Sequence, residues 1–132
     1  MAVDQTTFYE RIGGRAGVRL LANRFYDIMQ TERSSQSILA MHPMDLTRSR
    51  KQLERYLCEL MGGPKLFGEA YMSPEWIKQR HKHLEIGFDE RDQWVACMSQ
   101  AMREMDVEAS LQDDLNSLFF QLAGFIRNHT GH

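Results

Sequence analysis

Apolar residues recur three and four positions apart along almost the whole chain, and this period constrains the fold more than any other feature. Such spacing places one apolar stripe on each helix. The segment from Gly14 to about Gln30 carries a stripe at Val18, Leu21, Ala22, Phe25 and Met29. No segment alternates apolar and polar residues as a half-buried strand does, so the sequence predicts an all-α fold.

End signals divide the next part of the chain into helices. A short helical piece covers 38–41 and stops there, because Pro43 disfavours helical backbone at His42. A long helix is expected to begin near Asp45 as its N-cap and to end at Gly62-Gly63-Pro64. This helix is expected to bury Leu46, Ser49, Arg50, Leu53, Leu57, Leu60 and Met61.

Three further helices complete the prediction. Ser73-Pro74 starts a shorter helix that reaches about His83. Asp89 and Asp92 open the next helix, whose predicted apolar set is Trp94, Val95, Met98, Ala101, Met102 and Met105. The last helix has Asp113 and Asp114 near its start and is expected to bury Leu111, Leu115, Leu118, Phe119, Leu122 and Ile126.

Length and charge narrow the class of protein. A chain of 132 residues fits one domain over 1–132, and 16 basic against 18 acidic side chains leave a net charge of −2. This balance gives no indication of nucleic acid or a membrane surface as a partner. The chain shows no secretory signal and no apolar run of transmembrane length, so we expect a cytoplasmic protein. Cys58 and Cys97 lie in apolar segments and are expected to be buried, reduced thiols.

One histidine lies on a predicted apolar stripe. His81 is four residues after Ile77 and three before Leu84, whereas His83 falls on the other side of the helix. The two imidazoles therefore cannot face one ion. The chain has no HExxH and no Cys-x-x-Cys motif, which excludes the common zinc sites. An inward histidine is either a hydrogen-bonded core residue or a metal ligand, and spacing alone leaves both open.

Short motifs follow one another in a specific order. They are Tyr9-Glu10-Arg11-Ile12-Gly13-Gly14, Phe25-Tyr26-Asp27, His42-Pro43 before Asp45-Leu46, Gly62-Gly63-Pro64, Arg80-His81, and Glu90-Arg91-Asp92-Gln93-Trp94 with Cys97-Met98. Each fragment alone is weak evidence for membership of a family. In this order and with these separations, the chain resembles the second group of truncated haemoglobins over nearly its whole length. The resemblance implies a shortened globin fold, a two-over-two helical sandwich around haem.

The resemblance also implies a cofactor site, position by position. His81 corresponds to the proximal ligand of the iron in haem b. Leu53, Tyr56 and Arg80 are expected to contact the haem as well. Iron with one imidazole ligand keeps an open axial position, which suits reversible binding of a diatomic gas.

On the distal side, the resemblance implies a polar pocket of Tyr26, His42, Trp94, Ser49 and Phe25. Oxygen held by ferrous haem carries partial negative charge, and each donor aimed at it contributes about 1.5 to 3 kcal/mol. Tyr26, Trp94 and His42 carry candidate donors, so we expect slow oxygen release. The competing interpretation is that the tyrosine and tryptophan are ordinary core residues and that the histidine is a solvated loop residue.

Several functions fit these residues. The first is high-affinity binding of oxygen, with nitric oxide and carbon monoxide as further ligands, which favours scavenging, sensing or redox chemistry over bulk oxygen transport. The second is enzymatic: nitric oxide dioxygenation or peroxide reduction. The chain has no flavin or nicotinamide domain, so turnover would need an external reductase. The third is a haem-free helical interaction module.

Overall fold

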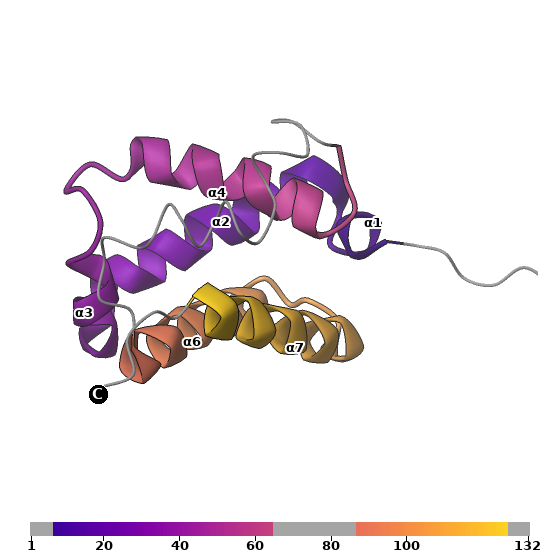
Figure 1. The fold of residues 1–132 in the computed structure, drawn as a ribbon. Helices are drawn as coiled ribbons and strands as arrows, with labels where there is room; N and C mark the ends of the chain where they lie inside the picture. The colour runs from indigo at the N-terminus through magenta and orange to yellow at the C-terminus, as the bar shows by residue number, and fades with distance from the viewer. Residues whose placement is uncertain (1–6, 65–86, 127–132) are drawn as a thin grey trace, which may run out of the picture.

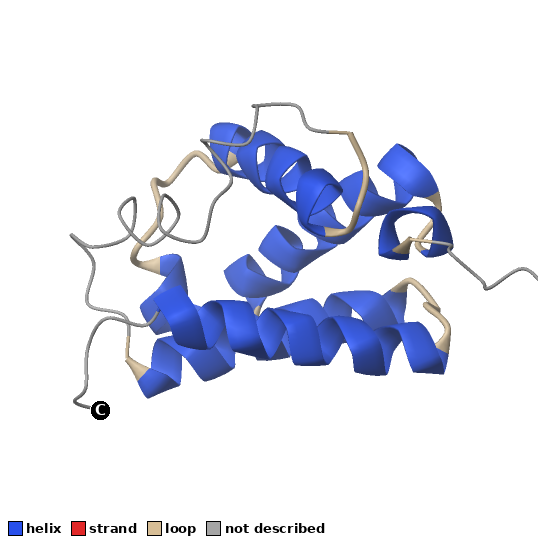
Figure 2. Cartoon of the chain, turned by 45° about the vertical axis from the view of Figure 1, so that its right-hand side comes forward, coloured by secondary structure: helices blue, strands red, loops and turns tan. Residues whose placement is uncertain are grey.

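The computed structural model describes residues 7–64 and 87–126, with side chains through residue 124, and every regular element in these ranges is helical (Figures 1 and 2). The elements are α1 (Phe8–Arg11), α2 (Gly14–Thr31), the 3₁₀ helix η1 (Arg33–Ser35), α3 (Gln36–Leu39), α4 (Thr47–Leu60), α6 (Phe88–Glu104) and α7 (Ala109–Ile126). The predicted all-α class is confirmed. None of the helices in these ranges is long and apolar enough to cross a membrane. The helix expected after Ser73 lies outside the described residues.

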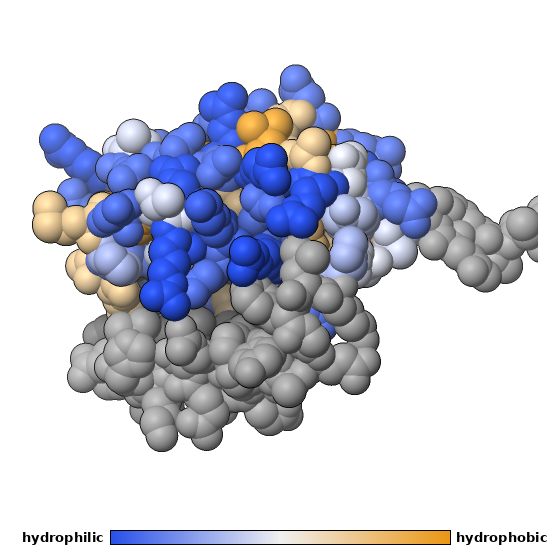
Figure 3. Space-filling model, turned by 90° about the horizontal axis from the view of Figure 1, so that it is seen from above, coloured by the Kyte–Doolittle hydropathy of each residue, from blue (hydrophilic) through white to orange (hydrophobic). Residues whose placement is uncertain are grey.

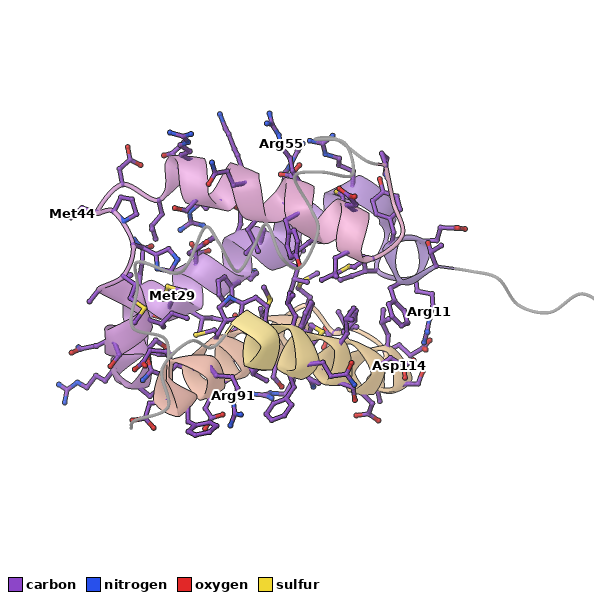
Figure 4. The ribbon with its side chains drawn as sticks, in the orientation of Figure 1. Arg11, Met29, Met44, Arg55, Arg91 and Asp114 are labelled. Carbon is purple, nitrogen blue, oxygen red and sulfur yellow. The ribbon has the colours of Figure 1, made fainter. Side chains whose placement is uncertain are left out.

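The long helices form two pairs (Figure 1). Helix α2 packs on α4, helix α6 packs on α7, and the pairs meet where α2 contacts α6. This is the two-over-two arrangement that the resemblance implies. At one end, Arg11 of α1 forms ion pairs with Glu108 at 3.0 Å and Asp114 at 3.4 Å, which connects α1 to the start of α7 (Figure 4).

Helix α2 is buried over a wider part of its circumference than a single apolar stripe would cover. Val18, Leu21, Ala22, Phe25 and Met29 are buried, as the period predicts. Tyr26 and Ile28 are buried as well. The reason is that α2 lies between α4 on one side and α6 on the other, so two apolar faces lose contact with water.

Helix α4 ends in a Schellman motif at the predicted glycines. The Gly63 N–H donates to the Cys58 carbonyl at 2.7 Å, and the Gly62 N–H donates to the Glu59 carbonyl at 3.1 Å. Gly62 has φ +93°, a left-handed conformation that glycine adopts without steric cost. A Cβ on Gly63 would lie 2.5 Å from the Tyr9 ring, so this turn also fixes how closely the first helix packs.

The start of α4 differs from the prediction by one position. The N-cap residue is Leu46, and Asp45 precedes it. The Asp45 carboxylate accepts a hydrogen bond from the Thr47 N–H at 3.0 Å, so it still satisfies a free donor of the first turn. The short helix before it, α3, begins and ends two residues earlier than predicted, because η1 leads directly into it.

The buried face of α4 is rotated from the one predicted. Leu46, Leu57 and Met61 are buried, as expected, together with Glu54 and Cys58. Ser49, Arg50, Leu53 and Leu60 were also expected to be buried, and they are only half-buried. The apolar period of α4 contains two neighbouring stripes, and only the one with Leu57 and Cys58 faces α2.

The second helix pair follows the predicted period in part. Met98, Ala101 and Met102 of α6 and Leu111, Leu115 and Phe119 of α7 are buried, whereas Trp94, Val95, Met105, Leu118 and Leu122 are half-buried. The side chain of Ile126 is outside the described set. Cys58 and Cys97 are buried and form no disulfide, and the Cys97 Sγ lies 3.2 Å from the Ser35 Oγ.

Two glycine substitutions test how closely α1 and α2 approach. A Cβ on Gly17 would lie 2.0 Å from the Ile12 carbonyl oxygen, whereas no described atom lies within 4 Å of a Cβ on Gly124. We expect Gly17→Ala to lower the free energy of unfolding by about 2 kcal/mol, because backbone must shift. Gly124→Ala should raise it by about 0.5 to 1 kcal/mol through helix propensity. Urea unfolding of both variants measures the difference, and an equal gain in both would contradict the close approach.

Candidate functional site

Four of the predicted distal residues meet in one aromatic cluster. Phe25 and Tyr26 of α2 contact each other edge to face, with ring centroids 4.9 Å apart. The Trp94 ring of α6 lies 5.5 Å from Phe25, and the His42 ring lies 5.5 Å from Tyr26. Edge-to-face pairs at these distances are attractive beyond their burial. Three separate segments of the chain therefore supply one continuous cluster.

A fifth ring extends the cluster to the last helix. Phe119 of α7 lies 5.5 Å from Trp94, nearly perpendicular to it. The period predicts Phe119 as a core residue and gives no indication of this contact. Trp94 is thus held between Phe25 and Phe119, which restricts the direction of its indole N–H.

The polar ends of Tyr26 and Trp94 have no hydrogen-bond partner among the described residues. Tyr26 is only 6% exposed, and its recorded interactions are all ring contacts. Trp94 is half-buried, and its ring packs against Phe25 and Phe119 within the part of the chain that the structure describes. Neither donor is among the fully buried polar atoms of the described residues that lack a partner. Two donors that make no hydrogen bond to the described residues, on rings of one cluster, are a candidate recognition site for a small acceptor.

The Tyr26 phenol remains a donor over the whole physiological range. Burial raises the pKa of Tyr26 to about 12, although the nearby charge of Arg50 counteracts part of this effect. Burial, together with the charge of Glu59, also raises the pKa of Tyr56 to about 12. Both hydroxyl groups keep their protons at neutral pH.

His42 has a defined tautomer in its neutral form. Its Nδ1 lies 2.8 Å from the Ile38 carbonyl oxygen. A carbonyl only accepts hydrogen bonds, so Nδ1 must carry the proton and donate. In the neutral ring, Nε2 is then an acceptor. While His42 is neutral, only two of the three expected donors, Tyr26 and Trp94, can donate a hydrogen bond to a ligand.

Arg50 of α4 is a site residue whose role the sequence does not reveal. Its guanidinium carbon lies 5.8 Å from the centre of the Tyr26 ring. It donates to the Asn23 carbonyl at 2.9 Å and to the Asp27 carboxylate at 2.8 Å. Arg50 thus fixes α4 against α2 beside Tyr26. The adjacent Tyr26-Asp27 pair in the motif is the only sequence signal for this contact.

The two predicted cofactor residues of α4, Leu53 and Tyr56, share one face with the predicted distal residue Ser49. Ser49, Leu53 and Tyr56 are spaced four and three residues apart, which places them in a row along the helix. All three are half-buried, and Leu53 and Tyr56 pack against the core cluster on one side only. This row, continued by Leu60, is an incompletely covered apolar stripe beside the one that faces α2. His81 and Arg80 lie outside the described residues.

Comparison with known proteins finds globins. A family model described as bacterial-like globin matches residues 7–128. A cold-adapted truncated haemoglobin of the Antarctic bacterium Pseudoalteromonas haloplanktis TAC125 is 37% identical, with a TM-score of 0.87 over 94% of this chain and 99% of its own. A group II 2-on-2 haemoglobin of Agrobacterium tumefaciens is 36% identical, with a TM-score of 0.86 over 98% of this chain and 99% of its own. Group 2 truncated haemoglobin YjbI of Bacillus subtilis (strain 168) is 28% identical over 107 residues, 81% of this chain and 77% of that protein.

The raised pKa of Tyr26 predicts alkaline sensitivity. An unfolded tyrosine ionises near pH 10. Because the folded pKa is about 12, the unfolded state loses its proton first, and stability falls as pH rises between these values. Each such tyrosine contributes at most about 1.4 kcal/mol per pH unit to this fall. In urea unfolding from pH 9 to 11.5, Tyr26→Phe and Tyr56→Phe should each flatten this fall in stability, because the folded pKa of both tyrosines is about 12. An unchanged slope in Tyr26→Phe would contradict the burial of its hydroxyl.

Proposed function

Because the chain belongs to the bacterial-like globin family, we propose that it is a haem protein that binds oxygen and other diatomic ligands tightly through Tyr26 and Trp94. The family and the truncated haemoglobin relatives support haem-based ligand binding in general. The observation that carries the finer proposal is the pair of unpaired donors on either side of Phe25. Neither donor forms a hydrogen bond with the described residues, so each is available to an acceptor bound beside the cluster.

The residues present fit a haem group. Leu53 and Tyr56 belong to the incompletely covered stripe of α4, and we assign this stripe to one face of haem b. His81 would be the iron ligand, with Arg80 next to it, as the motif order implies. When bound, haem iron supplies the position at which a diatomic gas binds. A flat apolar ring would cover the half-buried side chains that the rest of the described chain leaves open.

Tyr26 and Trp94 would act by donating hydrogen bonds. The phenol of Tyr26 keeps its proton, and an indole N–H can only donate. A hydrogen bond to a partly charged acceptor contributes about 1.5 to 3 kcal/mol. His42 would position Tyr26 rather than donate in its neutral form, since its Nδ1 is bonded to Ile38 and its ring packs on the phenol.

The donors can be tested one at a time. We expect Tyr26→Phe and Trp94→Phe each to accelerate oxygen dissociation by about tenfold to hundredfold, the equivalent of one such hydrogen bond. Stopped-flow measurement of oxygen release checks this. Tyr9→Phe is a matched control, because Tyr9 packs against Gly63 and makes no ring contact with the cluster. Release rates in both variants equal to that of Tyr9→Phe would refute the distal roles.

The proximal assignment has an equally direct test. We expect His81→Ala to lose or alter the visible haem absorption of the purified protein, and added imidazole to restore it. His83→Ala is the control, because its position falls on the other side of the predicted helix. Identical spectra for both variants would exclude His81 as the ligand. A wild-type protein that stays colourless after reconstitution would favour the haem-free interaction module.

Redox catalysis is the second candidate function. Tyr26 and Trp94 are oxidisable side chains that both contact Phe25, which favours peroxide reduction over plain storage. Nitric oxide dioxygenation uses the same proposed pocket. Either reaction would need electrons from an external reductase, and its rate of turnover with that reductase separates catalysis from binding. The cytoplasmic location remains a prediction.

A further inference from the structure

A basic groove lies between α2 and α4, and its charged lining shares Arg50 with the surroundings of Tyr26. Its charged lining consists of Arg15, Arg19, Arg50, Lys51, Glu54 and Arg55, and its volume is about 430 Å³. Five cations and one carboxylate give this lining a formal charge of +4. The whole chain carries −2, so the remainder carries −6. Figure 3 views the molecule from the α4 side, where hydrophilic side chains predominate in the described part.

Glu54 organises two of the arginines. Its carboxylate accepts hydrogen bonds from the Nε of Arg15 at 2.8 Å and the Nε of Arg19 at 3.0 Å. Burial would raise the pKa of Glu54, but the hydrogen bonds from Arg19 and Arg15 outweigh it and lower that pKa, so the group is ionised at neutral pH. The Glu54 side chain is 10% exposed, against 43% for Arg15 and 60% for Arg19. The buried carboxylate thus holds both guanidinium groups by their inner edges.

The outer edges of these arginines remain available to a partner. Glu54 uses only the Nε of Arg15 and the Nε and one Nη of Arg19. A guanidinium held along one edge is ready to bind a carboxylate along the other with little loss of side-chain freedom. Lys51 and Arg55 are exposed on the next turns of α4, and Arg55 extends away from α6 and α7 (Figure 4).

We propose that this groove binds a short acidic segment of a partner protein, in which several Asp or Glu carboxylates contact the arginine edges and Lys51. Arginine clusters recognise acidic motifs in this way. The separation of charge between the groove and the remainder of the chain would also turn the groove toward an acidic partner during approach.

The surroundings of the groove argue against other polyanions. The remainder of the chain has a formal charge of −6, which repels a long nucleic acid but not a short segment that stays within the groove. The groove is concave, whereas an anionic membrane surface is flat. A free phosphate compound would meet half-exposed side chains rather than the converging backbone N–H groups of a built phosphate site.

Binding of a labelled peptide tests the proposal. The probe is a fluorescein-labelled peptide of about ten residues that alternates Glu and Ser, and its neutral counterpart alternates Gln and Ser. Fluorescence anisotropy with the full-length protein should show salt-sensitive binding of the Glu peptide only. The double variant Lys51→Glu, Arg55→Glu should bind about tenfold more weakly, since two positive side chains of the groove become negative. The affinity of the double variant Lys51→Gln, Arg55→Gln for the Glu peptide should lie between the affinities of the charge-reversal variant and the wild type.

A control double variant distinguishes an effect of the groove from an effect of the net charge of the protein. Arg33→Glu, Arg103→Glu changes the charge equally at exposed positions on η1 and α6, and it should bind the peptide like the wild type. Equal weakening in both charge-reversal variants would overturn the proposal. So would tighter binding of pyrophosphate or of an oligonucleotide than of the Glu peptide, which would assign the groove to another class of ligand. None of these readouts depends on haem, so failure here leaves the proposed function unaffected.

Discussion

The placement of α2 between two layers is the constraint on which the rest of the structure depends. One side of α2 packs on α4 and another on α6, so consecutive residues of this helix serve different layers. Neighbouring side chains on a helix point about 100° apart. Phe25 therefore reaches Trp94 of α6, while Tyr26 reaches His42 and lies under Arg50 of α4. A strictly one-sided helix could not join the two pairs through adjacent aromatic rings.

The parts of the fold that the sequence predicts correctly are those that depend on one helix at a time. The period identifies the most deeply buried residues of α2, α6 and α7, because each helix presents its apolar residues to a neighbour, although Leu118 and Leu122 are only half-buried. In α4 the period contains two adjacent stripes, and spacing cannot tell which one faces α2. Leu53 is therefore half-buried although it was expected in the core, and the charged Glu54 is buried in its place.

Interactions between distant segments account for the features that sequence reasoning missed. Glu54 is stable in its buried position only because Arg15 and Arg19, on another helix, neutralise it. The hydrogen bond from His42 Nδ1 to the Ile38 carbonyl depends on the backbone conformation at Ile38. This bond makes Nε2 an acceptor in the neutral ring. The motif order does place Phe25, Tyr26, His42 and Trp94 in one cluster. It carries no information on which of their polar atoms lack a partner.

Helix α4 presents different surfaces to different surroundings, and Arg50 lies where they meet. One stripe faces α2, a second is the half-covered apolar row assigned to haem, and the outer turns carry the basic groove. Arg50 lines the groove, donates to Asp27 and lies over the Tyr26 ring. Its charge already opposes the burial that raises the pKa of Tyr26. Arg50 therefore belongs both to the lining of the groove and to the surroundings of Tyr26.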